Sequence, residues 1–142
     1  MTETINTTLV SSFKHADIFI VGDKPELAIV KATSSYIPIA EFKKIFFSIG
    51  ELVKSNKITK LIFDKSNLNV FHQPSMEWYF TEWKEEMYNL GLKTHRKILP
   101  ENEIFKQSVK IGRAKISAAY PNGKFHEMDI AYANSLEEAI NN

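Results

Sequence analysis

Cysteine is absent from the 142-residue sequence. The chain can therefore form no disulfide, use no thiolate in catalysis and bind no zinc through cysteine. Long apolar runs are also absent, because the most apolar N-terminal stretch, "IFIVGDKPELAIV", is interrupted by charged residues and a proline. Such a stretch cannot span a bilayer. The N-terminus has neither the basic start nor the apolar core of a signal peptide, so a cytoplasmic protein is expected.

A strong net charge is missing as well. The formal charge is +1, so no overall positive field would attract nucleic acid or an acidic membrane. Hydrophobic residues make up 44% of the chain and charged residues 25%, which is typical of a folded globular protein. We therefore expect contact with neither nucleic acid nor the interior of a membrane. From the chain length we expect a flexible leader at residues 1–14, followed by one domain at 15–142.

Alternating strand and helix patterns fill the predicted domain. Two apolar runs flank the turn "GDKP" and predict a β-hairpin. Helical stripes, Pro-led starts and short apolar runs then predict a helix at 39–53, a strand at 60–64, a helix at 74–90, a strand at 95–99, a helix at 103–116, a strand at 125–133 and a short helix from 135. The order ββαβαβαβα predicts an α/β fold, bordering on α+β, with a mostly parallel sheet and helices mainly on one face.

Two aromatic residues fall outside the apolar stripes of their helices. In the helix at 74–90, the stripe contains Met76, Phe80, Trp83, Met87 and Leu90, with Tyr79 beside it. Trp78 lies nearly opposite this stripe, and Phe47 leaves the stripe of its own helix in the same way. Both are candidate interface anchors, since tryptophan is enriched at binding hot spots. The alternative is that loops, the leader or lysine side chains of the same chain cover them.

Ordered motifs resemble those of STAS-like domains, the fold of the bacterial anti-sigma-factor antagonists and a relative of the CRAL-TRIO lipid-binding domains. The motifs are "KLIFDKSNLNV", "QPSMEWYFTEWKEEMYNLGLK", "ILPENEIFKQSV" and "YANSLEEAI". They are most similar to an uncharacterised bacterial branch of this family, over about residues 17–140. The resemblance implies a fold more directly than an activity.

The resemblance also implies a place for a phosphorylation switch. In the antagonists, a partner kinase phosphorylates a serine in an Asp-Ser-Ser-Gly-like turn at the start of the second helix. The corresponding turn here reads "NVFHQPSME", and that motif is absent. Ser75 and Ser66 are the candidate phosphorylation sites, and a helix start would favour the added charge. The alternative is that the loop only connects strand and helix at the carboxyl edge of the sheet.

Catalytic and metal-binding patterns are not found in the sequence. The four histidines are not paired at the spacing of metal ligands, and no phosphate-binding or nucleophile motif occurs. Asp64, at the end of a predicted strand, is expected to cap the following turn rather than act as a general base. We therefore predict no enzyme, no cofactor and no metal.

Two functions remain as predictions. The first is a non-enzymatic, STAS-like regulatory or protein-interaction module that binds an unknown protein partner or forms a homodimer. The second is a carrier of a small hydrophobic ligand or lipid, of the CRAL-TRIO kind. A carrier needs a cavity of several hundred Å3, whereas the many aromatic residues of this short chain are expected to fill its core.

Overall fold

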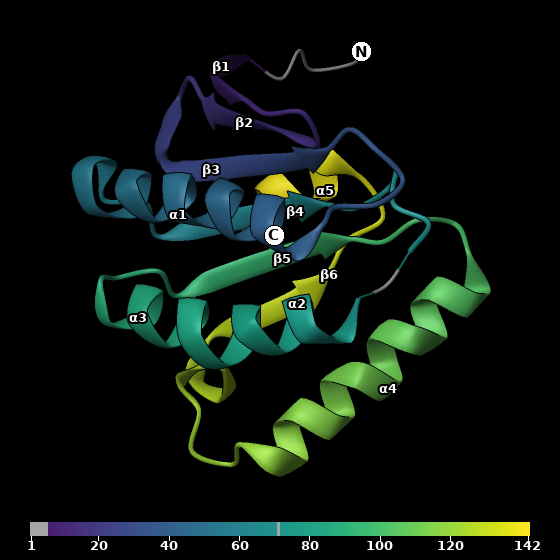
Figure 1. Cartoon of the computed structure of the whole chain (residues 1–142). Helices are drawn as coiled ribbons and strands as arrows, with labels where there is room; N and C mark the ends of the chain where they lie inside the picture. Colours follow the sequence, from purple (N-terminus) through teal and green to yellow (C-terminus); the bar gives the residue numbers. More distant parts are fainter. Residues whose placement is uncertain (1–5, 71) are drawn as a thin grey trace.

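A computed structural model of the chain describes residues 6–70 and 72–142. The described residues form a six-stranded sheet whose strands lie side by side in chain order (Figure 1). The strands are β1 (Thr7–Ser12), β2 (Ala16–Val21), β3 (Lys24–Ala32), β4 (Lys60–Asp64), β5 (Thr94–Ile98) and β6 (Asp129–Tyr132). The first three pair antiparallel, while β3 to β6 pair parallel. The predicted hairpin, the α/β class and the mostly parallel sheet are confirmed.

The N-terminal segment is where the prediction is wrong. Thr7–Ser12 were assigned to a flexible leader but form β1, which pairs with β2 at the edge of the sheet. Its side chains are mostly exposed, so it carries no alternating apolar pattern that would identify a strand. An irregularity between Leu9 and Ser11 shifts its register, as is common in edge strands. Residues 1–5 of the predicted leader lie outside the described residues.

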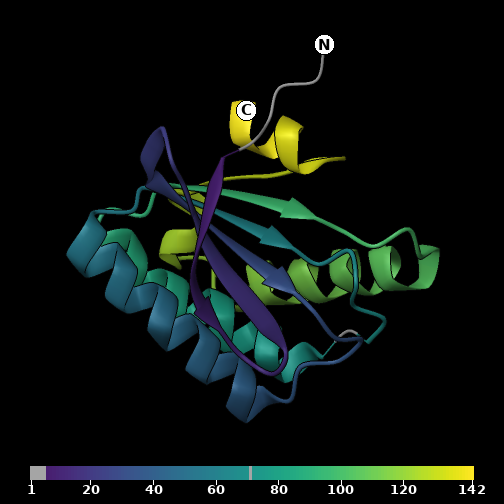
Figure 2. The same cartoon turned by 90° about the horizontal axis from the view of Figure 1, so that it is seen from above.

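The helices divide unequally between the two faces of the sheet. Figure 2 shows α1, α2, α3 and α4 on one face and α5 on the other, which confirms the prediction of helices mainly on one side. The helical segments are α1 (Ile39–Asn56), α2 (Gln73–Trp78), η1 (Tyr79–Trp83), α3 (Lys84–Asn89), α4 (Glu103–Ala119), η2 (Lys124–Glu127) and α5 (Leu136–Asn141).

Alternating strand residues build one hydrophobic cluster on each face. On β4, Leu61 and Phe63 join the larger cluster beneath the helices, whereas Ile62 joins the smaller cluster beneath α5. Buried residues of α1 and of the segment α2–η1–α3 complete the larger cluster. The sheet is therefore covered on both sides, with the thicker layer on the side of the long helices.

One continuous helical segment joins α2, η1 and α3. Its middle turn, Tyr79–Trp83, is a π turn, which contains more residues than an α turn. Tyr79, Phe80, Trp83 and Lys84 are all buried as a result. The segment ends at Asn89, and Gly91 just beyond it has a φ of 113°, which glycine readily adopts. Leu90, predicted on the buried stripe, is instead 42% exposed, because the helix has already ended and the π turn has shifted its phase.

One further prediction differs in detail. Residues Lys124–Glu127 form the 3-10 helix η2 rather than the start of a strand, so β6 is only four residues long. The ring of Phe125 packs edge-on against Phe80, with centroids 5.2 Å apart, and this contact draws the segment under the helices. At the start of α5, Ser135 Oγ accepts from the amide of Glu138, whose carboxylate accepts from the amide of Asn134, the residue before the N-cap.

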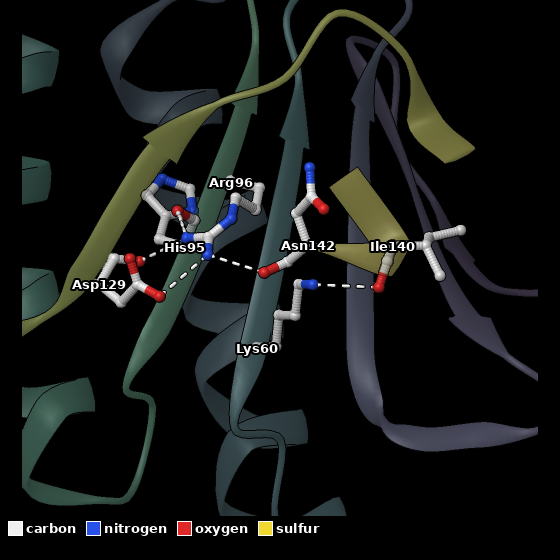
Figure 3. Close-up of polar contacts among 6 residues, drawn as sticks. All are labelled: Lys60, His95, Arg96, Asp129, Ile140 and Asn142. Atoms are coloured by element: carbon white, nitrogen blue, oxygen red, sulfur yellow. Dashed lines mark hydrogen bonds and ion pairs between the residues drawn. The ribbon is translucent and has the colours of Figure 1, made fainter. Parts of the chain in front are cut away.

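Polar contacts hold α5 against the sheet (Figure 3). The Arg96 guanidinium, on β5, donates to the Asp129 carboxylate at 2.9 Å and to the main-chain oxygen of Asn142 at 2.9 Å. Lys60 Nζ, on β4, donates to the carbonyl of Ile140 at 3.1 Å. The hydrogen bond and the charge of Arg96 keep the pKa of Asp129 below its ordinary value. The Arg96 and Lys60 cations therefore have hydrogen-bond partners. Two of the lysines on the opposite face have none among the described residues.

Candidate functional site

The two aromatic residues singled out from the sequence lie together on the surface. Phe47 of α1 and Trp78 of α2 meet edge to face, with ring centroids 5.6 Å apart. Phe47 is 59% exposed, and Trp78 is half-buried. An exposed pair of this kind is a compact apolar contact point on otherwise polar helix faces.

Trp78 is also partly covered by its own chain, as the alternative prediction held. Its ring packs edge-on against Phe42, at 6.1 Å between centroids. The ammonium of Lys43 lies 5.5 Å from the centroid of the Trp78 ring. Lys43 is thus attracted to the aromatic face, and its stem shields part of it. The residue that remains open to a partner is chiefly Phe47, with the outer edge of Trp78.

A shallow open groove of about 540 Å3 adjoins this pair. It runs beside the adjacent helices α1 and α2 (Figure 1). Its lining includes Lys43, Pro74, Glu77, Trp78, Glu82 and Tyr120. Tyr120, just after α4, donates a hydrogen bond to the Glu77 carboxylate at 3.0 Å and closes one end of the groove. We refer to the groove with Phe47 as the α1–α2 surface.

Charges of opposite sign border the α1–α2 surface on its two helices. On α1, half-buried Lys43 lies over the Trp78 ring, while Lys44 and Lys54 are ion-paired with Glu41 and Glu51 of the same helix, at 3.8 Å and 3.9 Å. On α2 and η1, Glu77 and Glu82 are exposed. The lysine left to face a partner's carboxylate is therefore Lys43. Sequence reasoning singled out the two aromatic residues but not the groove, because the contribution of Tyr120 depends on the tertiary position of α4.

The two candidate phosphorylation sites differ sharply in exposure. Ser66 is exposed, and its hydroxyl donates to Asp64 Oδ1 at 2.6 Å. The amide of Ser66 donates to the same oxygen, so Asp64 caps the turn, as predicted. Ser75, in contrast, is only 5% exposed. A kinase could reach Ser66 in this fold, whereas phosphorylation of Ser75 would require the helix start to open.

His72 explains why Ser75 is held inside. The imidazole Nδ1 accepts from the amide of Ser75 and caps α2. Since Nδ1 is therefore unprotonated, the Ser75 hydroxyl, 2.8 Å away, donates to it as well. The imidazole N–H is left at Nε2. This cap could not have been found from the sequence, because histidine is not among the residues that typically cap helices.

A small cavity lies next to this cap, at the carboxyl end of β4. Its volume is about 40 Å3. The polar side chains lining it include Lys65, His72, Ser75 and Tyr79, and the apolar ones include Phe63 and Phe105. Lys65 is 4% exposed, and its ammonium lies 4.9 Å from the centroid of Phe63. Burial, with a smaller contribution from the charge of Arg113, lowers the pKa of Lys65 to about 7.

His95 lies deeper on the same face of the sheet and is fully satisfied. Its Nδ1 donates to the carbonyl of Leu61 at 3.0 Å, so Nε2 is the acceptor for the Tyr79 hydroxyl, 2.8 Å away. Burial keeps the pKa of His95 well below its ordinary value. This histidine is therefore a neutral structural residue, and within the described residues no group of three or more acidic or histidine side chains is arranged to hold a metal ion.

Comparison with known proteins adds no family assignment: no protein-family model, characterised sequence or solved structure matches the chain. Across the described residues, no helix is both long and apolar enough to cross a membrane. The resemblance to STAS-like domains consequently stays a prediction from the motifs.

Proposed function

We propose that the chain is a non-enzymatic interaction module of the STAS-like kind, whose partner at the α1–α2 surface is a second copy of itself. The observation that carries the proposal is the Phe47–Trp78 pair at the surface, bordered by Lys43 of α1 and by Glu77 and Glu82 of α2 and η1. Large aromatic side chains at the centre of a polar rim are typical of interface hot spots.

Charge complementarity favours a second copy over a foreign protein. In a two-fold symmetric pair, each residue contacts its counterpart's neighbour reciprocally. An axis through the aromatic pair would bring α1 of one copy against α2 of the other. Lys43 of each copy would then face Glu82 of its partner, and two aromatic pairs would pack at the centre. A surface with one sign of charge would repel its own copy, but this surface carries both.

The alternative role as a lipid or hydrophobic-ligand carrier is less well supported. The cavity next to Lys65 has about 40 Å3, far below the ~300–1,000 Å3 of typical small-molecule pockets. The α1–α2 groove is larger, but it is open and bordered by charged side chains. It could not shield an acyl chain from water.

Sedimentation velocity at matched concentrations tests the pairing. We expect the wild-type chain to form dimers and Phe47→Ala to weaken them about 30-fold, which corresponds to ~2 kcal/mol at a hot spot. Ile104→Ala is the matched control, because Ile104 is 80% exposed on α4, away from this surface. It should leave the dimer unchanged.

A charge exchange tests the proposed orientation. Lys43→Glu alone and Glu82→Lys alone should each be monomeric, because each homodimer would oppose like charges at both contacts. An equal mixture of the two variants should recover dimers, since one contact then pairs the two exchanged charges, still opposite in sign, while the other contact is native. A wild-type chain that is monomeric at about 100 μM, a weak affinity for a specific homodimer, refutes self-pairing. Dimers that survive Phe47→Ala and both charge reversals place the interface elsewhere.

A further inference from the structure

Two lysine ammonium groups are enclosed beneath the helices with no hydrogen-bond partner among the described residues. Lys84 of α3 is 1% exposed and Lys97 of β5 is fully buried. The nitrogen atoms of both are buried and unpaired. They lie 3.5 Å and 4.4 Å from the centroid of the Phe80 ring. Fully buried lysine is rare in proteins unless it is paired.

Other cations surround these two amines. The guanidinium of Arg113, on α4, lies 5.9 Å from the same Phe80 centroid. Lys65, at the end of β4, is close enough for its charge to affect both Lys84 and Lys97. On β5, His95 also faces this region and is neutral. Over residues 6–70 and 72–142, no carboxylate acts on the pKa of any of the three lysines.

Stability alone does not account for this cluster. Burial lowers the pKa of Lys84 and Lys97 well below the ordinary value, with further lowering by the neighbouring cations. Holding the amines without charge costs folding free energy, and one aromatic ring cannot compensate several cations. Methionine at either position would fill similar space without that cost. An anionic group bound near the cluster would stabilise the charged form of the amines and so offset this cost in folding free energy.

The cavity beside Lys65 gives such a group a place. It has room for about three water-sized groups, which matches a carboxylate or a compact tetrahedral oxyanion. Lys65 lines the cavity directly. Tyr79 lines it too, and the side-chain nitrogen of Lys84 lies 4.5 Å from the centroid of the Tyr79 ring. The cavity also lies at the carboxyl end of a parallel strand, where ligands of α/β proteins commonly bind.

We propose that this cavity binds the oxyanion group of a small acid, with Lys65 as its direct partner and Lys84, Lys97 and Arg113 as the surrounding basic groups, whose charged forms the bound anion favours. His72 and Ser75 add polar side chains to the lining of the same cavity. The proposal goes beyond the pairing of two copies and does not depend on it, since the α1–α2 surface and this cavity share no charged residue.

Isothermal titration calorimetry with two probes tests the site. Sulfate represents a tetrahedral oxyanion and butyrate a carboxylate, and neither titrates near pH 8. We expect one of them to bind at low salt. Because Lys65 is largely neutral at pH 8 and an anion favours its charged form, binding should take up roughly half a proton or more, seen as a heat that depends on the ionisation enthalpy of the buffer.

Three variants decide whether the cluster is responsible. Lys65→Met and Lys84→Met should each weaken binding at least 10-fold. Lys110→Met, which removes one exposed cation from α4, should change it less than 2-fold. Lys84→Met should also raise the melting temperature of the free chain, so loss of binding cannot be attributed to unfolding.

Three outcomes count against the site. No binding of either probe at millimolar concentration overturns the proposal, as does equal weakening by Lys65→Met and Lys110→Met, which would indicate an adventitious ion only. Binding without proton uptake would also overturn the proposal, since the buried amines would then not gain protons when the anion binds. Preference for sulfate or for butyrate identifies a tetrahedral or a carboxylate ligand.

Discussion

Raising the pH from 7 to 9 should stabilise this protein. Lys65 is buried, and its pKa in the folded chain is about 7, whereas a lysine in the unfolded chain has the ordinary value of 10.5. Between these two values the unfolded chain binds more protons than the folded chain. The free energy of unfolding therefore rises with pH across this window, and the stabilisation is lost as the pH falls toward 7.

The magnitude follows from the two pKa values of Lys65. Proton binding to Lys65 stabilises both the unfolded and the folded chain, but less so as the pH rises. From pH 7 to pH 9, the stabilising factor falls about 100-fold for the unfolded chain and about twofold for the folded chain. The difference is about 2 kcal/mol for Lys65 alone. Lys84 and Lys97 are lowered in the same direction, and so is Lys60 on the opposite face. The total gain in the free energy of unfolding from pH 7 to pH 9 should therefore be at least as large as the gain from Lys65 alone.

Urea unfolding followed by tryptophan fluorescence at pH 7, 8 and 9 measures this effect. The window stops below pH 10, because burial raises the pKa of Tyr79 well above its ordinary value and its effect there has the opposite sign. Lys65→Met should reduce the gain between pH 7 and 9 by about 2 kcal/mol, while Lys110→Met should keep the full gain. A wild-type free energy of unfolding that is flat or falls from pH 7 to 9 refutes the assignment of neutral buried amines.

Two further predictions concern stability and modification. Trp83 is 3% exposed and donates to the carbonyl of Phe46 at 2.7 Å, so Trp83→Ala should cost ~3–5 kcal/mol in urea unfolding; a loss below about 1 kcal/mol would contradict its place in the core. Ser75→Glu should cost more than about 2 kcal/mol, because it buries a carboxylate beside the His72 cap, whereas Ser66→Glu, at an exposed turn, should cost less than about 1 kcal/mol. Equal costs in the same urea assay would show that the two sites do not differ in accessibility.

The sequence was most informative where apolar residues repeat at a helical or strand spacing. Trp83 was expected in the core, and its 3% exposure confirms this because the helical period determines which side chains face the sheet. Trp78 was expected outside the core, and it is half-buried, with one side packed against the core through Phe42. Asp64 was expected to cap a turn, and it does so because an aspartate at a strand end has nearby amides to accept from. These relations join residues that are close in the sequence, so the sequence alone was enough to predict them.

Features that depend on distant contacts could not be predicted. β1 is a strand only because β2 provides a partner, and its exposed threonines and serines look like a polar leader. Lys84 and Lys97 would be placed at the surface by their residue type, since lysine is almost never fully buried. Nothing in the sequence shows that α2–η1–α3, α4 and β5 would enclose them together.

The π turn connects the two proposed sites in one helical segment. Glu82, on the α1–α2 surface, and Lys84, in the cation cluster, are two residues apart, yet one is exposed and the other 1% exposed. A side chain two positions along a helix points away from its neighbour, so each site can change without a direct contact to the other. The backbone between them is the part they share.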